Sequence, residues 1–288
     1  MKERDVRDKN FVFIGGSHGM GRAAARALAE RGASVLIVAR GAEAGEAAAR
    51  EALGVGAASG SFIEADLSTV EGTRRAAEGI KARAPEIHGL MHTAMSPFRQ
   101  RKITEDGLEF AFALQYFARA ALNRLLRDNL AASGDGRIVH VAGNVSPGMA
   151  KVDLDDLQFE NRKWTFFRAI LGTHHLGFLH LQEAARRWEE LPICATAFCV
   201  NSVKTKVMLD REMPLIMRLM GRLGSSPEKA VGNAITLLTK ADNSDIGNVI
   251  CRKPGRFEPE PFNLDVDEAR RLWDITTRIG EERNLSLP

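Results

Sequence analysis

The chain has 288 residues, which suits one large domain or two small ones. Hydrophobic residues make up 44% and charged residues 27%, a composition that excludes a disordered, collagen-like or disulfide-stapled chain. The 40 basic and 37 acidic residues nearly balance, so we expect no nucleic-acid partner and no membrane partner. The charged N-terminus lacks a signal-peptide core and no run of about 20 apolar residues occurs, so we expect a cytoplasmic protein.

The N-terminal half alternates short apolar runs with longer helical stretches. Strands are predicted at Phe11–Ile14, Ser34–Ala39, Ser61–Ala65 and Gly89–Ala94. Helices are predicted at Arg22–Arg31, Glu43–Leu53, Val70–Ala84 and Gly107–Ala132. Strands that alternate with helices in this way are typical of βαβ units and a parallel sheet.

The C-terminal half continues the pattern with one interruption. Strands are predicted at Arg137–Val141, Ile193–Val200 and Gly247–Ile250, and helices at Arg168–Trp188 and Pro227–Thr239. No linker or repeat divides the chain, so residues 1–288 are predicted to form one α/β domain. Residues 204–224 form an insertion before the penultimate helix.

The three cysteines do not have the spacing of a zinc site or a redox pair. We therefore expect Cys194, Cys199 and Cys251 to be free buried thiols, and we expect no metal site.

A glycine-rich turn joins the first predicted strand to the first predicted helix. The unpaired N–H groups at a helix N-terminus bind phosphate well, and glycines allow the backbone to approach it closely. A dinucleotide is therefore the expected ligand of this turn. Its expected phosphate-binding residues are Gly15, Ser17, His18, Gly19, Met20 and Gly21.

Arg40 ends the second strand, where an acidic residue would favour NAD and an arginine favours the 2′-phosphate of NADP. The alternative is a solvated surface arginine. Asp66 and Leu67 follow the third strand and are expected to flank the adenine, although Asp66 could equally cap the helix that begins near Ser68.

These features together resemble the short-chain dehydrogenase/reductase family. They are the spacing Gly15-x-x-x-Gly19-x-Gly21, Arg40, Asp66-Leu67, Thr104–Glu109, Arg137–Val141, Pro227–Ala230 and Arg271–Trp273. The resemblance implies a single doubly wound Rossmann-type sheet of about seven parallel strands with helices on both faces. It also implies NADP(H) as cofactor, with Thr93, Ala94, Val203 and Thr205 near the ribose and nicotinamide.

The same resemblance implies an Asn, a Ser, a Tyr and a Lys as catalytic residues, but this chain has other residues at those positions. They are Gln115, Gly143, Ile170 and His174, and a one-residue shift in alignment would give Leu171 and His175 for the last two. The single tyrosine of the chain, Tyr116, lies in the long fourth helix and is expected to be a packing residue.

Three side chains are candidate helpers of a reduction without the tyrosine: Ser96, His174 and His175. A histidine can donate a proton at neutral pH. The alternative for both histidines is a structural role, or a hydrogen bond to the cofactor ribose.

Apolar side chains are expected at the carboxyl ends of the strands, where open α/β sheets bind ligands. The expected substrate contacts are Met95, Phe98, Met149, Phe167 and Met208. Because the insertion is rich in Met and Leu, we expect an apolar lid over a large flat ligand. The alternative is that these side chains pack against the sheet.

The expected function is NADPH-dependent reduction of a ketone on a polycyclic aromatic polyketide of the angucyclinone kind, in antibiotic biosynthesis. A phenol next to the ketone would then stabilise the alkoxide in place of the tyrosine. Two alternatives remain: a catalytically inactive NADP-binding regulatory or scaffold protein, and a non-redox cyclase or isomerase. The sequence makes no prediction of oligomeric state.

Overall fold

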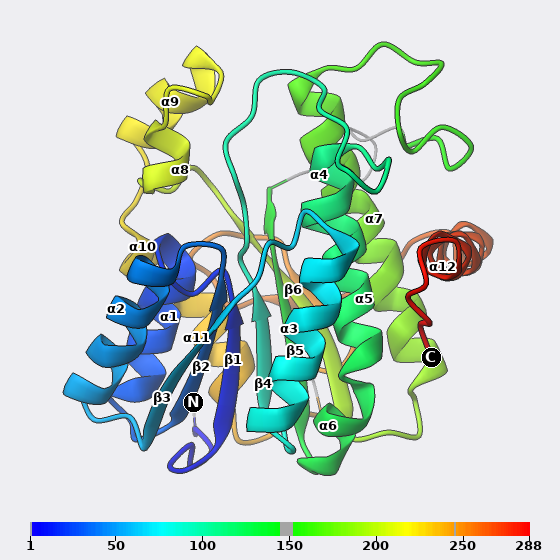
Figure 1. The fold of residues 1–288 in the computed structure, drawn as a ribbon. Helices are drawn as coiled ribbons and strands as arrows, with labels where there is room; N and C mark the ends of the chain where they lie inside the picture. The colour runs from blue at the N-terminus through cyan, green and yellow to red at the C-terminus, as the bar shows by residue number, and fades with distance from the viewer. Residues whose placement is uncertain (1, 145–151, 245) are drawn as a thin grey trace.

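The computed structural model describes residues 2–144, 152–244 and 246–288, which form one eight-stranded sheet in the order β3-β2-β1-β4-β5-β6-β7-β8 (Figure 1). The strands are β1 Asn10–Ile14, β2 Ser34–Ala39, β3 Ser59–Glu64, β4 Gly89–His92, β5 Gly136–Gly143, β6 Ile193–Val200, β7 Val249–Cys251 and β8 Pro259–Pro261. All neighbouring pairs are parallel except β7 and β8. The doubly wound α/β fold is confirmed, with one more strand than the seven predicted. Strand β8 was not predicted because it contains two prolines, and proline is tolerated only in an edge strand.

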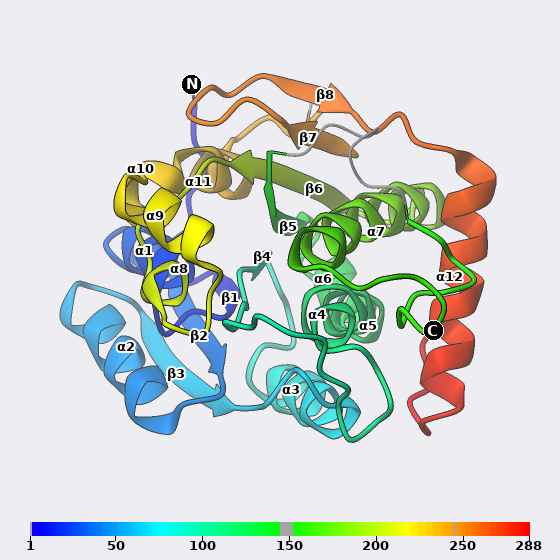
Figure 2. The same cartoon turned by 90° about the horizontal axis from the view of Figure 1, so that it is seen from above.

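Helices cover both faces of the sheet, as predicted (Figure 2). One face carries α1 Gly19–Ala29, α2 Ala42–Gly54, α10 Pro227–Ala230 and α11 Gly232–Thr239. The other carries α3 Val70–Arg83, α4 Phe110–Phe112, η1 Ala113–Phe117, α5 Ala118–Leu125, α6 Arg127–Ala132 and α7 Phe166–Arg187, with α12 Val266–Glu281 packed against α7. The predicted helix over residues 107–132 is thus divided into four segments, and η1 is a π-helical turn.

The alternation of side chains along β1 explains the two layers. Phe11 and Phe13 pack with the α1, α2 and α11 side chains, whereas Val12 and Ile14 pack with those of α3, α5 and α7. Successive strand residues point to opposite faces, so a strand that is apolar at every position is buried on both sides.

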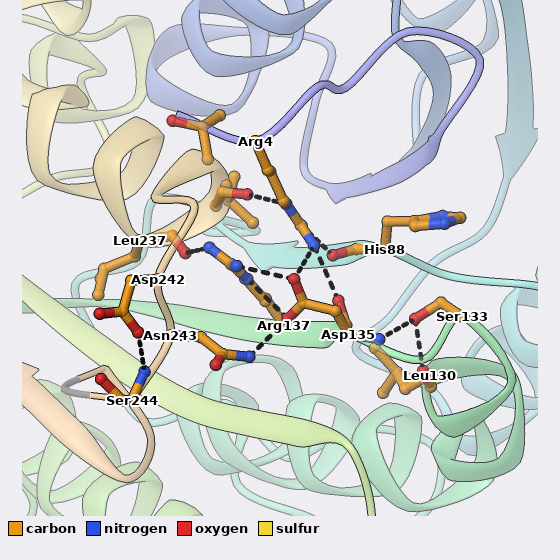
Figure 3. A network of polar contacts seen from close by, with 12 residues as sticks. Arg4, His88, Leu130, Ser133, Asp135, Arg137, Leu237, Asp242, Asn243 and Ser244 are labelled. Atoms are coloured by element: carbon orange, nitrogen blue, oxygen red, sulfur yellow. Dashed lines mark hydrogen bonds and ion pairs between the residues drawn. The ribbon is translucent and has the colours of Figure 1, made fainter. Parts of the chain in front are cut away.

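A network of charged groups lies at the amino-terminal ends of β1, β4 and β5 (Figure 3). The carboxylate of Asp135 binds Arg4 Nη1 at 2.7 Å and Arg137 Nη2 at 2.8 Å, and the Arg137 side chain is completely buried. Arg4 also donates to the backbone carbonyls of His88 and Leu238. These bonds join residues before β1, β4 and β5 to α11.

The insertion forms two short helices, α8 Lys206–Leu209 and α9 Leu215–Arg222, at the carboxyl ends of the strands (Figures 1 and 2). One stripe of this segment is apolar and exposed, from Leu215, which is 66% exposed, to Leu223, which is 91% exposed. No helix in the described parts of the chain is long and apolar enough to cross a membrane. All three cysteines are buried and free, as expected.

Candidate functional site

A cavity of about 750 Å³ lies at the carboxyl ends of the strands. Its lining comes from the turn after β1, the ends of β2, β4, β5 and β6, one side of α7, and the insertion helices. Most of the predicted site residues therefore share a single cavity, although they are spread from Gly15 to Met208.

The glycine turn opens the N-terminus of α1 toward this cavity. Gly15 has a φ of +89°, and a Cβ there would lie 2.6 Å from the backbone nitrogen of Ala94. A Cβ on Gly21 would lie 2.5 Å from the Gly15 carbonyl oxygen, so Gly21 provides close packing beneath the turn and does not line the cavity. The N-cap residue His18 makes no side-chain capping bond to the helix in the described structure, which leaves the first-turn N–H groups available to a ligand.

Positive charge surrounds the turn. Arg40 lines the cavity at the end of β2, is exposed, and has no hydrogen-bond or ion-pair partner within the described residues. Lys206 of α8 also lines the cavity. Burial, and then the charges of Lys206 and Arg22, lower the pKa of His18. An anionic group would be attracted to this end of the cavity.

Asp66 and Leu67 line the cavity beyond β3, as predicted for the adenine end. The alternative role of Asp66 as a helix cap is not seen: its Oδ1 accepts hydrogen bonds from Ser68 N at 3.0 Å and Ser68 Oγ at 2.7 Å. Thr69 caps α3 instead, accepting a hydrogen bond from Gly72 N.

The four residues predicted near ribose and nicotinamide all line the cavity; they are Thr93, Ala94, Val203 and Thr205. Thr93 Oγ1 donates to the Ile14 carbonyl at 3.0 Å and so fixes the end of β4 against β1. Thr205 accepts a hydrogen bond from Met208 N at 3.2 Å, which begins α8 beside the glycine turn.

The four positions that the resemblance assigns to catalysis also line the cavity; they are Gln115, Gly143, Ile170 and His174. The backbone N–H of Gly143 donates to His174 Nδ1 at 3.2 Å, which leaves the proton of the neutral ring on Nε2. Burial, and then the charge of Arg119, lower the pKa of His174 to about 3. At neutral pH His174 is therefore an uncharged hydrogen-bond donor.

The other candidate helpers are not all brought to the cavity. Ser96 lines it, but His175 does not: its Nε2 lies 3.7 Å from Glu268 Oε2 of α12. Successive helical residues point about 100° apart, so His174 and His175 cannot serve one site together. Tyr116 is buried with its hydroxyl 2.6 Å from Thr276 Oγ1, as expected of a packing residue, and burial raises its pKa.

The predicted substrate residues divide in the same way. Met95, Phe167 and Met208 line the cavity, together with Met217 and Met220 of α9. Phe98 is completely buried among aromatic rings, including Phe166 at a centroid distance of 5.1 Å, so its assignment to substrate contact is corrected to core packing. Met149 lies outside the described residues.

Among the cavity residues that the sequence analysis missed, Arg119 carries a buried charge. Arg119 of α5 is 6% exposed and lines the cavity. Its Nη1 donates to the Val141 carbonyl at 2.9 Å and its Nη2 to the Ala94 carbonyl at 3.4 Å. The signal in the sequence was its position four residues after Gln115, which places both side chains on the same helical face.

Comparisons with known proteins agree with this fold. A model of the short chain dehydrogenase family matches residues 9–151. Human retinol dehydrogenase 12 is 33% identical over 94% of this chain and 86% of its own length. The putative daunorubicin C-13 ketoreductase DnrU of Streptomyces sp. (strain C5) is 27% identical over 69% of this chain and 67% of its own length. The structure of Pseudomonas aeruginosa RhlG in an NADP active-site complex is 20% identical, covers 88% of this chain and 97% of that one, and superposes with a TM-score of 0.67. By its sequence and its fold, this chain belongs to the short-chain dehydrogenase family of oxidoreductases.

Proposed function

We propose that the protein is an NADPH-dependent reductase of a ketone on a polycyclic aromatic polyketide, and that it works without a tyrosine acid. One observation carries this proposal: a single cavity runs from the glycine turn, past His174, to the apolar side chains of Met208, Met217 and Phe167. A nucleotide and a flat apolar ligand can meet in such a space.

The nucleotide half of the cavity fits a dinucleotide. A Cβ at Gly15 would clash with the backbone of Ala94, so this turn requires glycine; the N-terminus of α1 is open, and Arg40 and Lys206 supply positive charge. Arg40 would hold the 2′-phosphate, Asp66 and Leu67 would flank the adenine, and Thr93 and Thr205 would lie near the ribose and nicotinamide. NADPH, when bound, supplies the hydride. The NADP complex of RhlG supports this choice of cofactor.

The apolar half favours an aromatic ligand. Methionine side chains adapt to flat ligands, and those of α8 and α9 form one wall of the cavity as a lid. The similarity to DnrU, named as a daunorubicin C-13 ketoreductase, supports a ketone substrate of this class. The combination of an NADP side, no catalytic tyrosine and an apolar lid is also similar to that of the angucyclinone ketoreductase of simocyclinone biosynthesis.

The residues beside the expected ketone position determine the chemistry. Ile170 and Leu171 line the cavity where the resemblance predicts the tyrosine, and neither can donate a proton. Loss of a general acid typically costs about 10²–10⁴-fold in rate. A phenol of the substrate, hydrogen-bonded to the ketone oxygen, would supply the proton instead, while Ser96 and the Nε2–H of His174 orient the substrate.

The first test compares aromatic ketones with and without a phenol next to the carbonyl. We expect NADPH oxidation, followed by its near-ultraviolet absorbance, only with the hydroxylated ketones. Tight NADPH binding with no oxidation by any ketone would favour the inactive NADP-binding alternative. A rearranged product without NADPH oxidation would favour a cyclase or isomerase.

The second test changes the cofactor-specificity residue. Arg40→Ala removes a charged hydrogen bond to phosphate, worth about 1.5–3 kcal/mol, and should raise the KM for NADPH about 10- to 100-fold. The KM for NADH should barely change, because NADH lacks that phosphate. Arg50→Ala, at an exposed arginine of α2 outside the cavity, is the matched control. Equal effects of Arg40→Ala on both cofactors would contradict the assignment.

A further inference from the structure

We propose that Arg119 makes an oxyanion-binding site in the cavity, which takes a phenolate or enolate oxygen of the bound polyketide. The class of ligand rests on the proposed function, whereas the site itself rests on the contacts of Arg119 and its neighbours. A buried cation without a counter-ion is costly, so its place in a ligand cavity needs an explanation.

The positive charge of Arg119 has no carboxylate partner in the described part of the chain. Two of its nitrogens donate to backbone carbonyls, those of Val141 and Ala94, and its Nε has no hydrogen-bond partner there. Burial lowers its pKa to about 10, and no acidic residue counteracts that effect. The guanidinium therefore remains charged at neutral pH with neutral partners only.

Neighbouring groups in the same cavity are donors as well. Gln115, one helical turn before Arg119, is 2% exposed, and its Nε2 has no acceptor among the described residues. The Nε2–H of His174 is a third donor. Asp66, the only carboxylic acid among the described residues that line the cavity, lies at the end of the cavity assigned to adenine. The end of the cavity around Arg119 thus has no acidic side chain among the described residues, and an anionic oxygen would supply an acceptor to these donors.

This site would assist the reduction after the proton moves. NADPH, when bound, would supply a hydride to the carbonyl carbon and become NADP⁺, and the carbonyl π electrons would move to the oxygen. That oxygen takes the proton of the neighbouring phenol, so a phenolate remains near Arg119. Solvent returns the proton when the product leaves. Fixed positive charge in a site of low dielectric stabilises the phenolate without reorganisation.

The test measures the ionisation of a phenol bound in the cavity and does not depend on turnover. The probe is 2-hydroxyanthraquinone, whose visible absorption band shifts when its phenol ionises. An apolar cavity alone raises the pKa of a phenol, whereas a nearby cation lowers it by about 1–3 units. We expect the bound dye to ionise at a lower pH than the free dye, and about one pH unit or more lower in the wild type than in Arg119→Gln. Arg119→Lys should keep most of the shift.

Controls separate this proposal from the proposed function. Arg124→Gln removes another buried arginine of α5, one that stacks on Trp273 and does not line the cavity, and should leave the dye pKa unchanged. NADPH affinity should be the same in Arg119→Gln and the wild type. The proposal is overturned if the dye does not bind, if binding raises its pKa in the wild type, or if Arg119→Gln weakens NADPH alone. A lowered dye pKa without NADPH oxidation by any ketone would retain the oxyanion site and reject the reductase.

Discussion

His180 of α7 is a titratable side chain that is buried in the described structure. It is 2% exposed, and neither Nδ1 nor Nε2 has a hydrogen-bond partner in the described structure. Its ring stacks on Trp273 at a centroid distance of 5.3 Å and an interplanar angle of 8°. Burial, and then the charge of Arg124, lower its pKa from 6.5 to about 3. The folded protein therefore holds this ring neutral under conditions in which the unfolded chain protonates it.

His180→Phe should make the protein less sensitive to acid. The unfolded chain binds this proton below pH 6.5 and the folded chain does not until about pH 3, so the wild type loses stability as the pH falls through this interval. The loss is about 1.4 kcal/mol per pH unit, or about 2 kcal/mol at pH 5. Phenylalanine keeps the stacking and leaves no ring nitrogen unpaired, so its free energy of unfolding at pH 7.5 should equal or exceed that of the wild type.

Urea unfolding of both proteins from pH 8 to pH 5 measures the difference. The free energy of unfolding of the variant should fall less steeply with falling pH, by about one proton, because His180 no longer titrates. It should still fall, because His92 and His174 also have pKa values of about 3 in the folded protein. His18→Gln, at an exposed histidine, should change the slope much less. Identical slopes for His180→Phe and the wild type would refute the argument.

Two further predictions concern residues outside the cavity. Asp135→Ala leaves Arg4 and the fully buried Arg137 without their carboxylate, and urea unfolding should show a loss of about 3 kcal/mol while the KM for NADPH stays unchanged. Tyr116→Phe removes one hydrogen bond, to Thr276, and should cost about 1 kcal/mol of stability. Its kcat/KM should remain within about twofold of the wild type, since a buried hydroxyl outside the cavity supplies no proton; a drop by orders of magnitude would make Tyr116 the acid.

The sequence alone predicted the fold and most residues at the glycine-turn end of the cavity because both depend on local patterns. Apolar runs, helical periodicity and the glycine spacing at Gly15 are set by neighbours along the chain. The strand at Pro259–Pro261 escaped prediction because its pairing partner, β7, defines it and its own composition does not.

The substrate half depends on which way individual side chains point, and there the sequence was less informative. Phe98 and Met95 are three residues apart in a loop, yet one is core and the other lines the cavity. The choice between His174 and His175 depended on the rotation of α7 against the sheet and α12. The role of Arg119 depends on its having no carboxylate partner among the described residues, which only the folded chain shows.

The ionic network of Arg4, Asp135 and Arg137 lies before β1 and at the start of β5, whereas the ligand cavity lies at the carboxyl ends of the strands. Different residues therefore contribute to the stability of the fold and to ligand binding. Substitutions at the methionine-rich wall of the cavity can change ligand binding while the network of Arg4, Asp135 and Arg137 still stabilises the fold, so the protein is a stable starting point for directed evolution.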